Sequence, residues 1–209
     1  MLDRVADAVE KACPERPVDL TLGVSAELLP AVERRDLDLA LVGLPARRRD
    51  LNTFPVASVQ LSVAMRRDDP LATTGRLHVE DINDRIVVML SSDAAPASLD
   101  RLRSELVAAG LHNLRQLDHR DTAKTATHVR REHTLAVTIS PRFGGLAALY
   151  DDPQLVVIPL VDGPRQMFGL AWRSDREAEP ALQGILGALR NEWADGPTDL
   201  SESSLTTEE

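Results

Sequence analysis

Apolar residues recur along this chain with two spacings, and the segment 17–45 shows both. Apolar and polar residues alternate at 18–22, which is the spacing of a half-buried strand. Three apolar residues within 28–32 share one face of a helix, and the unbroken apolar run that begins at Leu39 is typical of a strand covered on both sides. The pattern therefore predicts a strand at 18–22, a helix, and a strand at 39–43.

Two residues bear on where this helix begins. Ser25 stands where the helix would start, and its hydroxyl is of the kind that satisfies the free N–H groups of a first turn. Pro30 lies inside the helical pattern and has no N–H to donate. We therefore expect the regular helix to start near Leu28, with Pro30 in its first turn.

The same spacings predict the other elements. Amphipathic helices are expected in five further segments: residues 2–13, 99–109, 121–132, 143–150 and 180–193. Strands are expected in six: residues 57–65, 85–90, 114–117, 135–139, 155–160 and 166–172. Strands that alternate with helices predict an α/β fold with mostly parallel sheet. Binding sites on such sheets lie beyond the carboxyl ends of the strands.

The composition is that of a globular protein. Apolar residues make up 43% of the 209 residues and aromatic residues only 3%, so the core must consist of aliphatic side chains. No apolar run approaches the roughly 20 residues of a membrane-spanning helix, and the first residues lack the apolar core of a signal peptide. The single cysteine, Cys13, cannot form an internal disulfide. These features favour a cytoplasmic protein.

The net charge of −9 argues against nucleic-acid binding by electrostatic attraction. The main basic run, Arg47–Arg49, is interpreted as a solvated loop, as charge runs usually are. Residues 197–209 are rich in Ser, Thr and acidic side chains and have little to bury. This segment is expected to be disordered.

Catalytic and metal-binding patterns are not found in the sequence. His112, His119 and His128 have no regular ligand spacing with acidic residues or cysteine. The Glu132–His133 pair lacks a nucleophile in a recognisable constellation, and no Gly-rich phosphate loop is present. We therefore expect no catalysis, no metal and no cofactor.

Four short motifs, in this order, carry a resemblance to a known family. They are Leu37–Ala40, Asp69–Ala72, Leu135–Pro141 and Ala171–Arg173. With them the chain resembles the effector-binding domain of LysR-type transcriptional regulators over residues 2–195.

The resemblance implies a periplasmic-binding-protein-like fold of type 2. Two α/β lobes are expected, each with a central mixed, mostly parallel sheet. Lobe 1 would comprise residues 1–61 and 165–195, lobe 2 residues 62–164, and the acidic tail residues 196–209. A small effector would bind between the lobes and shift the balance between two arrangements of the regulator.

The resemblance also implies which residues contact the effector. They follow helix starts and strand ends, and they are Val24, Ser25, Gly43, Leu44, Ser91, Ser92, Thr138 and Ser140. The three serines fall at expected helix starts, where N–H groups and the helix dipole attract anions. An anionic metabolite is therefore the expected effector, although each serine could equally be a plain helix cap.

The sequence departs from the family at three places. The family's winged helix-turn-helix does not precede this domain, and the first strand of lobe 1 is missing, which would leave two strands with unpaired backbone groups. We therefore expect a fragment, a misplaced start or a decayed relative. Arg35 and the Glu132–Thr134 turn stand where the family often has glycine. A residue other than glycine is strained at positive φ.

The expected function is that of a small-molecule effector-sensing domain, with DNA bound only through a helix-turn-helix outside this sequence. A second copy or a full-length regulator is the expected protein partner. Two alternatives are a stand-alone solute-binding protein and a dimerising interaction module that does not bind DNA.

Overall fold

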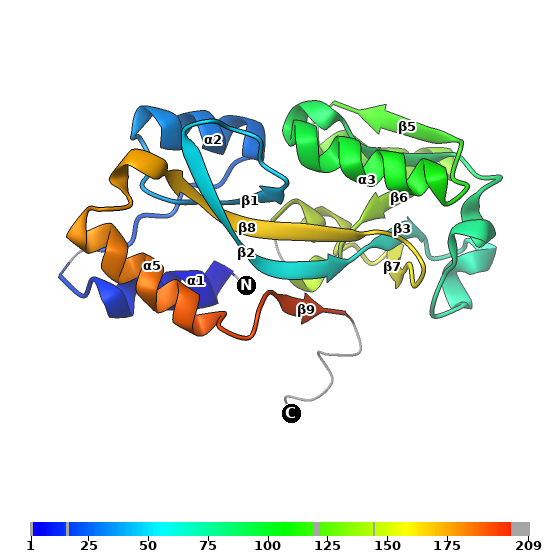
Figure 1. The fold of residues 1–209 in the computed structure, drawn as a ribbon. Helices are drawn as coiled ribbons and strands as arrows, with labels where there is room; N and C mark the ends of the chain where they lie inside the picture. The colour runs from blue at the N-terminus through cyan, green and yellow to red at the C-terminus, as the bar shows by residue number, and fades with distance from the viewer. Residues whose placement is uncertain (1, 16, 119–121, 144, 202–209) are drawn as a thin grey trace. The chain divides into compact units, whose positions relative to one another are not determined.

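The computed structural model describes residues 2–15, 17–118, 122–143 and 145–201. The chain divides into two compact units, shown together in Figure 1. Unit 1 comprises residues 1–58 and 167–199, and unit 2 comprises residues 59–166 and 200–209. Each unit is built on its own sheet.

Unit 1 is built from three helices and the strands of the first sheet. Its helices are α1 (Leu2–Ala12), α2 (Ser25–Arg34) and α5 (Pro180–Glu192). The strands of this sheet are β1 (Ala40–Leu44), β2 (Leu51–Gln60), β8 (Arg165–Arg173) and β9 (Thr198–Leu200), in the order β1-β8-β2-β9. Strand β1 pairs antiparallel with β8, with Ala40 opposite Ala171 and Leu44 opposite Met167.

Buried aliphatic side chains hold unit 1 together in two places. Between α2 and its strands the buried cluster consists of Leu29, Val32, Ala40, Val42, Leu51 and Ala171. Helix α1 lies against α5, where Val5 and Leu186 are among the buried residues. Arg4 adds a polar link, because its guanidinium lies 4.9 Å from the ring centre of Trp193 and donates to Glu192.

Unit 2 carries the larger sheet. Its strands are β3 (Ser62–Arg66), β4 (Val87–Leu90), β5 (Leu114–Leu117), β6 (Leu135–Thr138) and β7 (Leu155–Pro159). Their order is β5-β4-β6-β3-β7. Strand β4 is parallel to both β5 and β6, whereas β3 is antiparallel to β6 and β7. The sheet is therefore mixed, and parallel pairing is confined to β5, β4 and β6.

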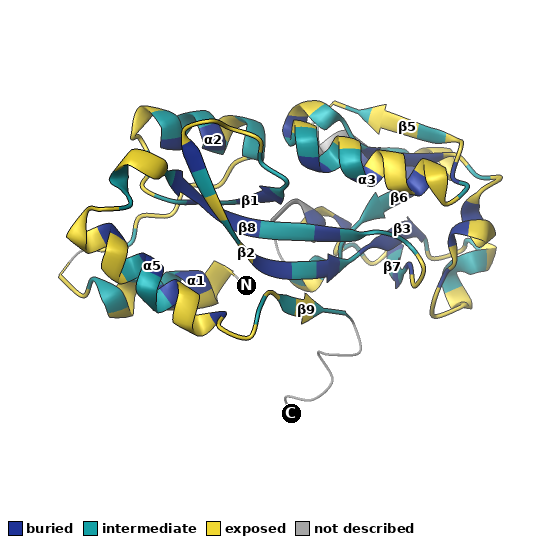
Figure 2. Cartoon of the chain, in the orientation of Figure 1, coloured by how far each residue is buried: buried dark blue, intermediate teal, exposed yellow. Residues whose placement is uncertain are grey.

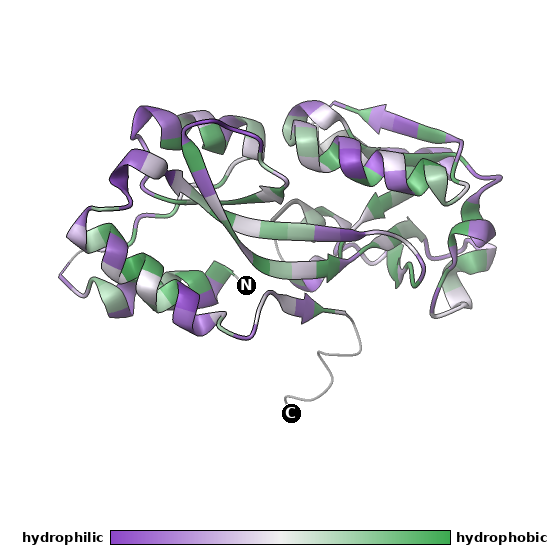
Figure 3. Cartoon of the chain, viewed as in Figure 1, coloured by the Kyte–Doolittle hydropathy of each residue, from purple (hydrophilic) through white to green (hydrophobic). Residues whose placement is uncertain are grey.

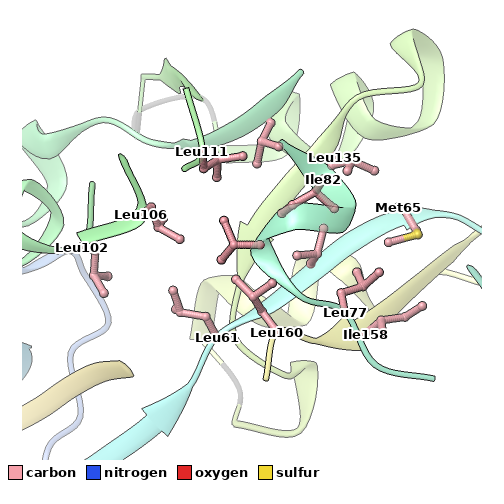
Figure 4. Close-up of a cluster of buried hydrophobic side chains, with 13 residues drawn as sticks. Leu61, Met65, Leu77, Ile82, Leu102, Leu106, Leu111, Leu135, Ile158 and Leu160 are labelled. Atoms are coloured by element: carbon pink, nitrogen blue, oxygen red, sulfur yellow. The ribbon is translucent and has the colours of Figure 1, made fainter. Parts of the chain in front are cut away.

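Helices α3 (Pro96–Ala108) and α4 (Thr122–Glu132) complete unit 2, with short 3-10 helices that include η2 (Val79–Ile82). The main core cluster, drawn in Figure 4, has thirteen buried residues, among them Met65, Leu106 and Leu135. Strand β3 is buried from Ser62 to Met65 (Figure 2), and the central strands are among the most hydrophobic parts of the chain (Figure 3). This aliphatic core agrees with the low aromatic content.

The α/β fold predicted from the sequence is confirmed. The helices expected at 2–13 and 180–193 are α1 and α5, and the strand expected at 114–117 is β5 with the same bounds. The helix expected to close at Gly110 is α3, and Gly110 has the positive φ of 107° that suits a helix end.

The strand predicted at 18–22 is wrong. The structure assigns no strand between α1 and α2, and the side chains of Leu20 and Leu22 are 55% and 81% exposed. Alternation describes a strand that has a neighbour to pair with. Within the described residues, β1 has a neighbour on one side only, which is β8.

Helix α2 and two other predicted segments also differ from expectation. Helix α2 begins at Ser25 rather than near Leu28, because the Val24 carbonyl accepts the Glu27 and Leu28 N–H groups. Pro30 therefore lies inside the helix, beyond its first turn. The strand expected at 57–65 is two strands, β2 and β3, separated at Leu61, and the helix expected at 143–150 is two 3-10 helices.

The acidic tail is in part structured. Residues 198–200, expected to be disordered, form β9, which pairs with β2 in the first sheet. Arg165 also bonds to Leu200, and Trp193 to Thr198. Residues 202–209 of the expected tail and Asp121, where the helix expected at 121–132 begins, lie outside the described residues.

Both turns that lack the expected glycine adopt positive φ. Arg35, which ends α2, has φ 68°, and His133, which follows α4, has φ 52°. Side chains other than glycine are strained there by roughly 1–2 kcal/mol. Both residues thus have the backbone conformation that glycine adopts without strain.

We expect His133→Gly to raise the free energy of unfolding by about 0.5–1 kcal/mol, since glycine relieves the strain but loses more backbone entropy on folding. His112 is an exposed loop histidine with ordinary φ, so His112→Gly is the matched control and should not stabilise. Urea unfolding of both variants measures the difference. A His133→Gly variant no more stable than wild type would contradict a strained turn.

Asp69 is the first residue of the motif Asp69–Ala72, which follows β3. Its carboxylate, 6% exposed, accepts from Arg85 at 2.7 Å and from the Leu71 N–H at 3.0 Å. Burial raises the pKa of Asp69, but the bonds from Arg85 and Leu71 outweigh it, so the pKa lies below its ordinary value of 3.8. The charged form therefore stabilises the folded state.

We expect Asp69→Asn to lower the free energy of unfolding at neutral pH by about 1–3 kcal/mol, because Arg85 loses a charged partner. The difference from wild type should be complete above about pH 5 and disappear as the pH falls through the lowered pKa. Urea unfolding at several pH values measures it. Asp68→Asn, on a carboxylate 61% exposed, is the control and should cost less. Equal losses in the two variants would contradict this role.

Candidate functional site

In unit 1, the structure brings together the two segments that were predicted to contact an effector, residues 24–25 and 43–44. The Ser25 hydroxyl oxygen accepts the N–H of Gly43 at 3.1 Å, which joins the first residue of α2 to the carboxyl end of β1. Val24 and Leu44 adjoin these two residues in the chain. Ser25 was expected to cap its helix, but the N-cap position is held by Val24, and the serine hydroxyl is bonded to the strand instead.

The position of Leu44 depends on a glycine in the neighbouring strand. A Cβ added to Gly169 of β8 would lie 2.5 Å from the Leu44 side chain and 2.7 Å from the Phe54 carbonyl oxygen. Real carbon atoms do not approach so closely, so only glycine fits at this place. Gly169 therefore lets β1 and Leu44 lie close against β8.

The start of α2 offers donors, and one carboxylate lies close to them. The N–H groups of Ser25 and Ala26 have no carbonyl four residues earlier within the helix, as in every first turn. The Glu27 carboxylate lies 3.5 Å from the Val24 nitrogen. A ligand at this end would meet N–H donors, the Ser25 hydroxyl and one neighbouring negative charge.

In unit 2, the predicted residues follow two parallel neighbours. Strands β4 and β6 pair in register, with Val87 opposite Leu135, so their carboxyl ends lie at the same edge of the sheet. The residues after β4 are Ser91 and Ser92, and those at the end of β6 are Thr138 to Ser140. The structure therefore places the predicted residues of this unit at one edge.

The two serines of this edge differ in their bonding. The Ser91 hydroxyl oxygen accepts from the Asp93 N–H at 3.3 Å, and the Ser91 N–H donates to Leu117 of β5. The Ser92 hydroxyl bonds to the Asp100 carboxylate and accepts from Gln116 at 3.2 Å. The Ser92 hydroxyl therefore donates its proton to a carboxylate. For the Ser91 hydroxyl proton, no acceptor is found among the described residues.

Both serines were expected at the start of a long helix, but neither of them begins one. They begin a three-residue 3-10 helix at 92–94, and α3 starts only at Pro96. The reason is that Pro96, which suits a first helical position, sets a new helix start after Ala95.

The far side of this edge is polar and partly buried. Thr138 donates its hydroxyl to the Ile139 carbonyl at 3.2 Å, and the carbonyl of buried Ser140 accepts the Phe143 N–H at 3.1 Å. The edge thus presents hydroxyl groups held by short local bonds.

Three residues that bear on these sites were missed from the sequence. Asp100 of α3 and Gln116 of β5 bond to Ser92, and Gly169 leaves the space that the Leu44 side chain occupies. Gly169 carried a usable signal, since a glycine inside a predicted strand marks a close approach of another backbone. The other two are ordinary polar residues on exposed positions.

The carboxyl group of Asp175 belongs to a structural ion pair of unit 1. Arg173, and to a lesser extent Arg35, lower the pKa of Asp175 to about 2. Arg173 also donates to the Glu33 carbonyl at 2.6 Å, so this network fastens the end of α2 to β8. Among the residues that the structure describes, no group of three or more His, Cys, Asp or Glu could hold a metal ion. No helix in the same residues is long and apolar enough to span a membrane.

Comparison with solved structures supports the fold. The effector-binding domain of QuiR in complex with shikimate matches with a TM-score of 0.73 at 14% identity, covering 95% of this chain and 92% of that one. The BenM effector-binding domain with benzoate gives 0.71 at 16%, covering 93% and 86%. The reduced OxyR regulatory domain from Pseudomonas aeruginosa gives 0.64 at 16%, covering 91% and 90%.

The chain spans only part of longer relatives. It covers 66% of full-length BenM and 60% of a full-length OxyR from Pseudomonas aeruginosa. A comparison with curated proteins gives no match. The family model described as LysR substrate binding domain matches residues 2–194, which is nearly all of the described structure. The chain therefore belongs to the LysR substrate-binding domain family.

Proposed function

We propose that this chain senses a small anionic effector through Val24, Ser25, Gly43 and Leu44 of unit 1 and Ser91, Thr138 and Ser140 of unit 2. The bond between Ser25 and Gly43 is the observation that carries the proposal. It joins two segments 18 residues apart in the chain that were both predicted to contact a ligand. It also uses the serine oxygen as an acceptor, which leaves the hydroxyl proton available to a ligand.

An anion is supported by the donors at these positions. The N–H groups that open α2 carry the positive end of the helix dipole, and the Ser25 and Ser91 hydroxyls each have a proton to give. Two similar domains are described with shikimate and benzoate, both of which carry a carboxylate. Carboxylates of that size are the effectors proposed here.

Ser92 is a weaker candidate for the same task. Its hydroxyl is bonded to the Asp100 carboxylate, which would repel a second negative group. We propose that Ser92 positions the loop between β4 and α3, and that Ser91 is the donor of this edge.

The proposed role is regulatory and not catalytic. A bound effector alters a regulator only if it binds one arrangement of the protein more tightly than another. The candidate residues are hydroxyl and backbone groups, and the Ser92 hydroxyl, which bonds to the Asp100 carboxylate, is assigned to holding its loop and not to chemistry. The proposal places the chain in the cytoplasm with the DNA that such regulators control. DNA contact would be made by a separate helix-turn-helix.

We expect Ser25→Ala and Ser91→Ala each to weaken carboxylate binding about tenfold, since each removes one hydrogen bond to a charged ligand. Benzoate and shikimate are the first probes, followed by other small carboxylates, with affinity measured by calorimetry. Ser174→Ala and Ser104→Ala, which also remove one exposed serine hydrogen bond in units 1 and 2, are the matched controls and should bind normally. Full affinity in both test variants would contradict the proposal.

A further inference from the structure

Two polar side chains deep in unit 2 bond to each other. Ser98 of α3 is 1% exposed, and Gln166 of β8 is 6% exposed. The side-chain nitrogen of Gln166 donates to the Ser98 hydroxyl at 2.9 Å, and that hydroxyl donates to the Gln166 side-chain oxygen at 3.4 Å. The two residues are 68 positions apart in the chain, so the pair forms only once the helix and the strand have met.

Gln166 stands at the point where the chain leaves unit 2. It ends the segment 59–166 of that unit, and the chain enters unit 1 at Met167. The next residues of β8 lie opposite two candidate effector residues, Met167 opposite Leu44 and Phe168 opposite Gly43. The bond that fixes Gln166 therefore also fixes the start of the strand segment against which Gly43 and Leu44 lie.

Ser98 stands close to the candidate loop after β4. Asp100, in the same turn of α3, accepts the Ser92 hydroxyl proton, and Ser92 adjoins Ser91, the proposed donor of this edge. Farther along the helix, Leu102 belongs to the main buried cluster of unit 2. The core therefore holds α3 in place, and the first turns of this helix connect the loop to Ser98.

We propose that Ser98 and Gln166 are positioning residues of the effector site, which connect the loop after β4 to the strand beside Gly43 and Leu44. The proposal rests on the proposed function, since it joins the two sets of residues assigned to the effector. The connection itself consists of hydrogen bonds within each unit and one continuous strand between them. A change in the position of the loop would reach unit 1 through α3 and β8.

A buried polar pair suits this task because a hydrogen bond has a direction. Two apolar side chains of similar size would also be buried, but they could slide past each other, whereas a hydrogen bond weakens steeply when its angle changes. A Ser98 hydroxyl that lost its partner would be left without water in the interior, which is costly. The pair therefore keeps α3 and residue 166 in one arrangement.

A second bond between α3 and β8 lies nearer to the solvent. The Arg101 guanidinium donates to the Arg165 carbonyl at 2.7 Å and also bonds to Glu105. The Arg101 side chain is 29% exposed, so water can take the place of a lost bond here. We therefore assign the connection to the buried pair, and Arg101 provides a matched control on the same helix.

Amide NMR of the isotopically labelled full chain, without ligand, tests this proposal. Ser92→Ala releases the loop from α3 and should shift the amide signals of residues 43–44 and 167–168 in unit 1. The same change made in a Ser98→Ala, Gln166→Leu background should leave those signals where they are in that background alone. In an Arg101→Ala background the shifts should persist.

Two further controls separate this effect from a general loss of structure. Thr74→Ala, which also removes one exposed hydroxyl bond in unit 2, should not shift the signals of residues 43–44 and 167–168. The double variant replaces both polar partners, so its stability should stay close to that of wild type, which urea unfolding checks. Should it not fold, Ser98→Ala alone is the smaller change and gives the same comparison.

Three results would overturn the proposal. They are unchanged unit 1 signals in Ser92→Ala, shifts that persist without the Ser98–Gln166 pair, and shifts that Arg101→Ala abolishes as fully as the double variant does. The measurement uses no ligand, so its outcome is independent of effector binding. Failure of the proposed function would instead appear as full carboxylate affinity of the Ser25→Ala and Ser91→Ala variants.

Discussion

Backbone hydrogen bonding between neighbouring strands is the constraint on which both sets of candidate residues depend. In unit 2, the parallel pairing of β4 with β6 sets two strand ends at one edge, and Ser91 and Thr138 follow from it. In unit 1, β8 is the strand that pairs with β1 among the described residues, and a glycine at 169 allows the close contact. The Ser25 bond to Gly43 replaces part of the pairing that β1 lacks on its other side.

Local signals predicted those elements whose formation depends on local residues. The bounds of β5 were predicted from the local sequence. The positive φ at Arg35 and His133 was expected only because the family that the chain resembles often has glycine there. Val18–Leu22 was misjudged because alternation indicates only that a strand can form, while its pairing depends on a neighbour distant in sequence. The Ser92 bond to Asp100 was likewise beyond prediction, since a loop and a helix must first be folded to bring the two side chains together.

The edge of β1 that has no strand beside it among the described residues connects the fold to the candidate site. The Gly43 N–H at this edge bonds the Ser25 hydroxyl instead of a second strand, and that bond fixes the position of the hydroxyl. In the proposed function the same hydroxyl donates its proton to the effector.

The most direct test of the central claim is a titration of the isotopically labelled chain with benzoate or shikimate, followed by amide NMR. The account predicts that the largest shifts fall on the amides of residues 24–25, 43–44, 91–92 and 138–140, in both units. Saturable binding with its largest shifts elsewhere, for example at α1 and α5, would contradict the assignment of the effector site.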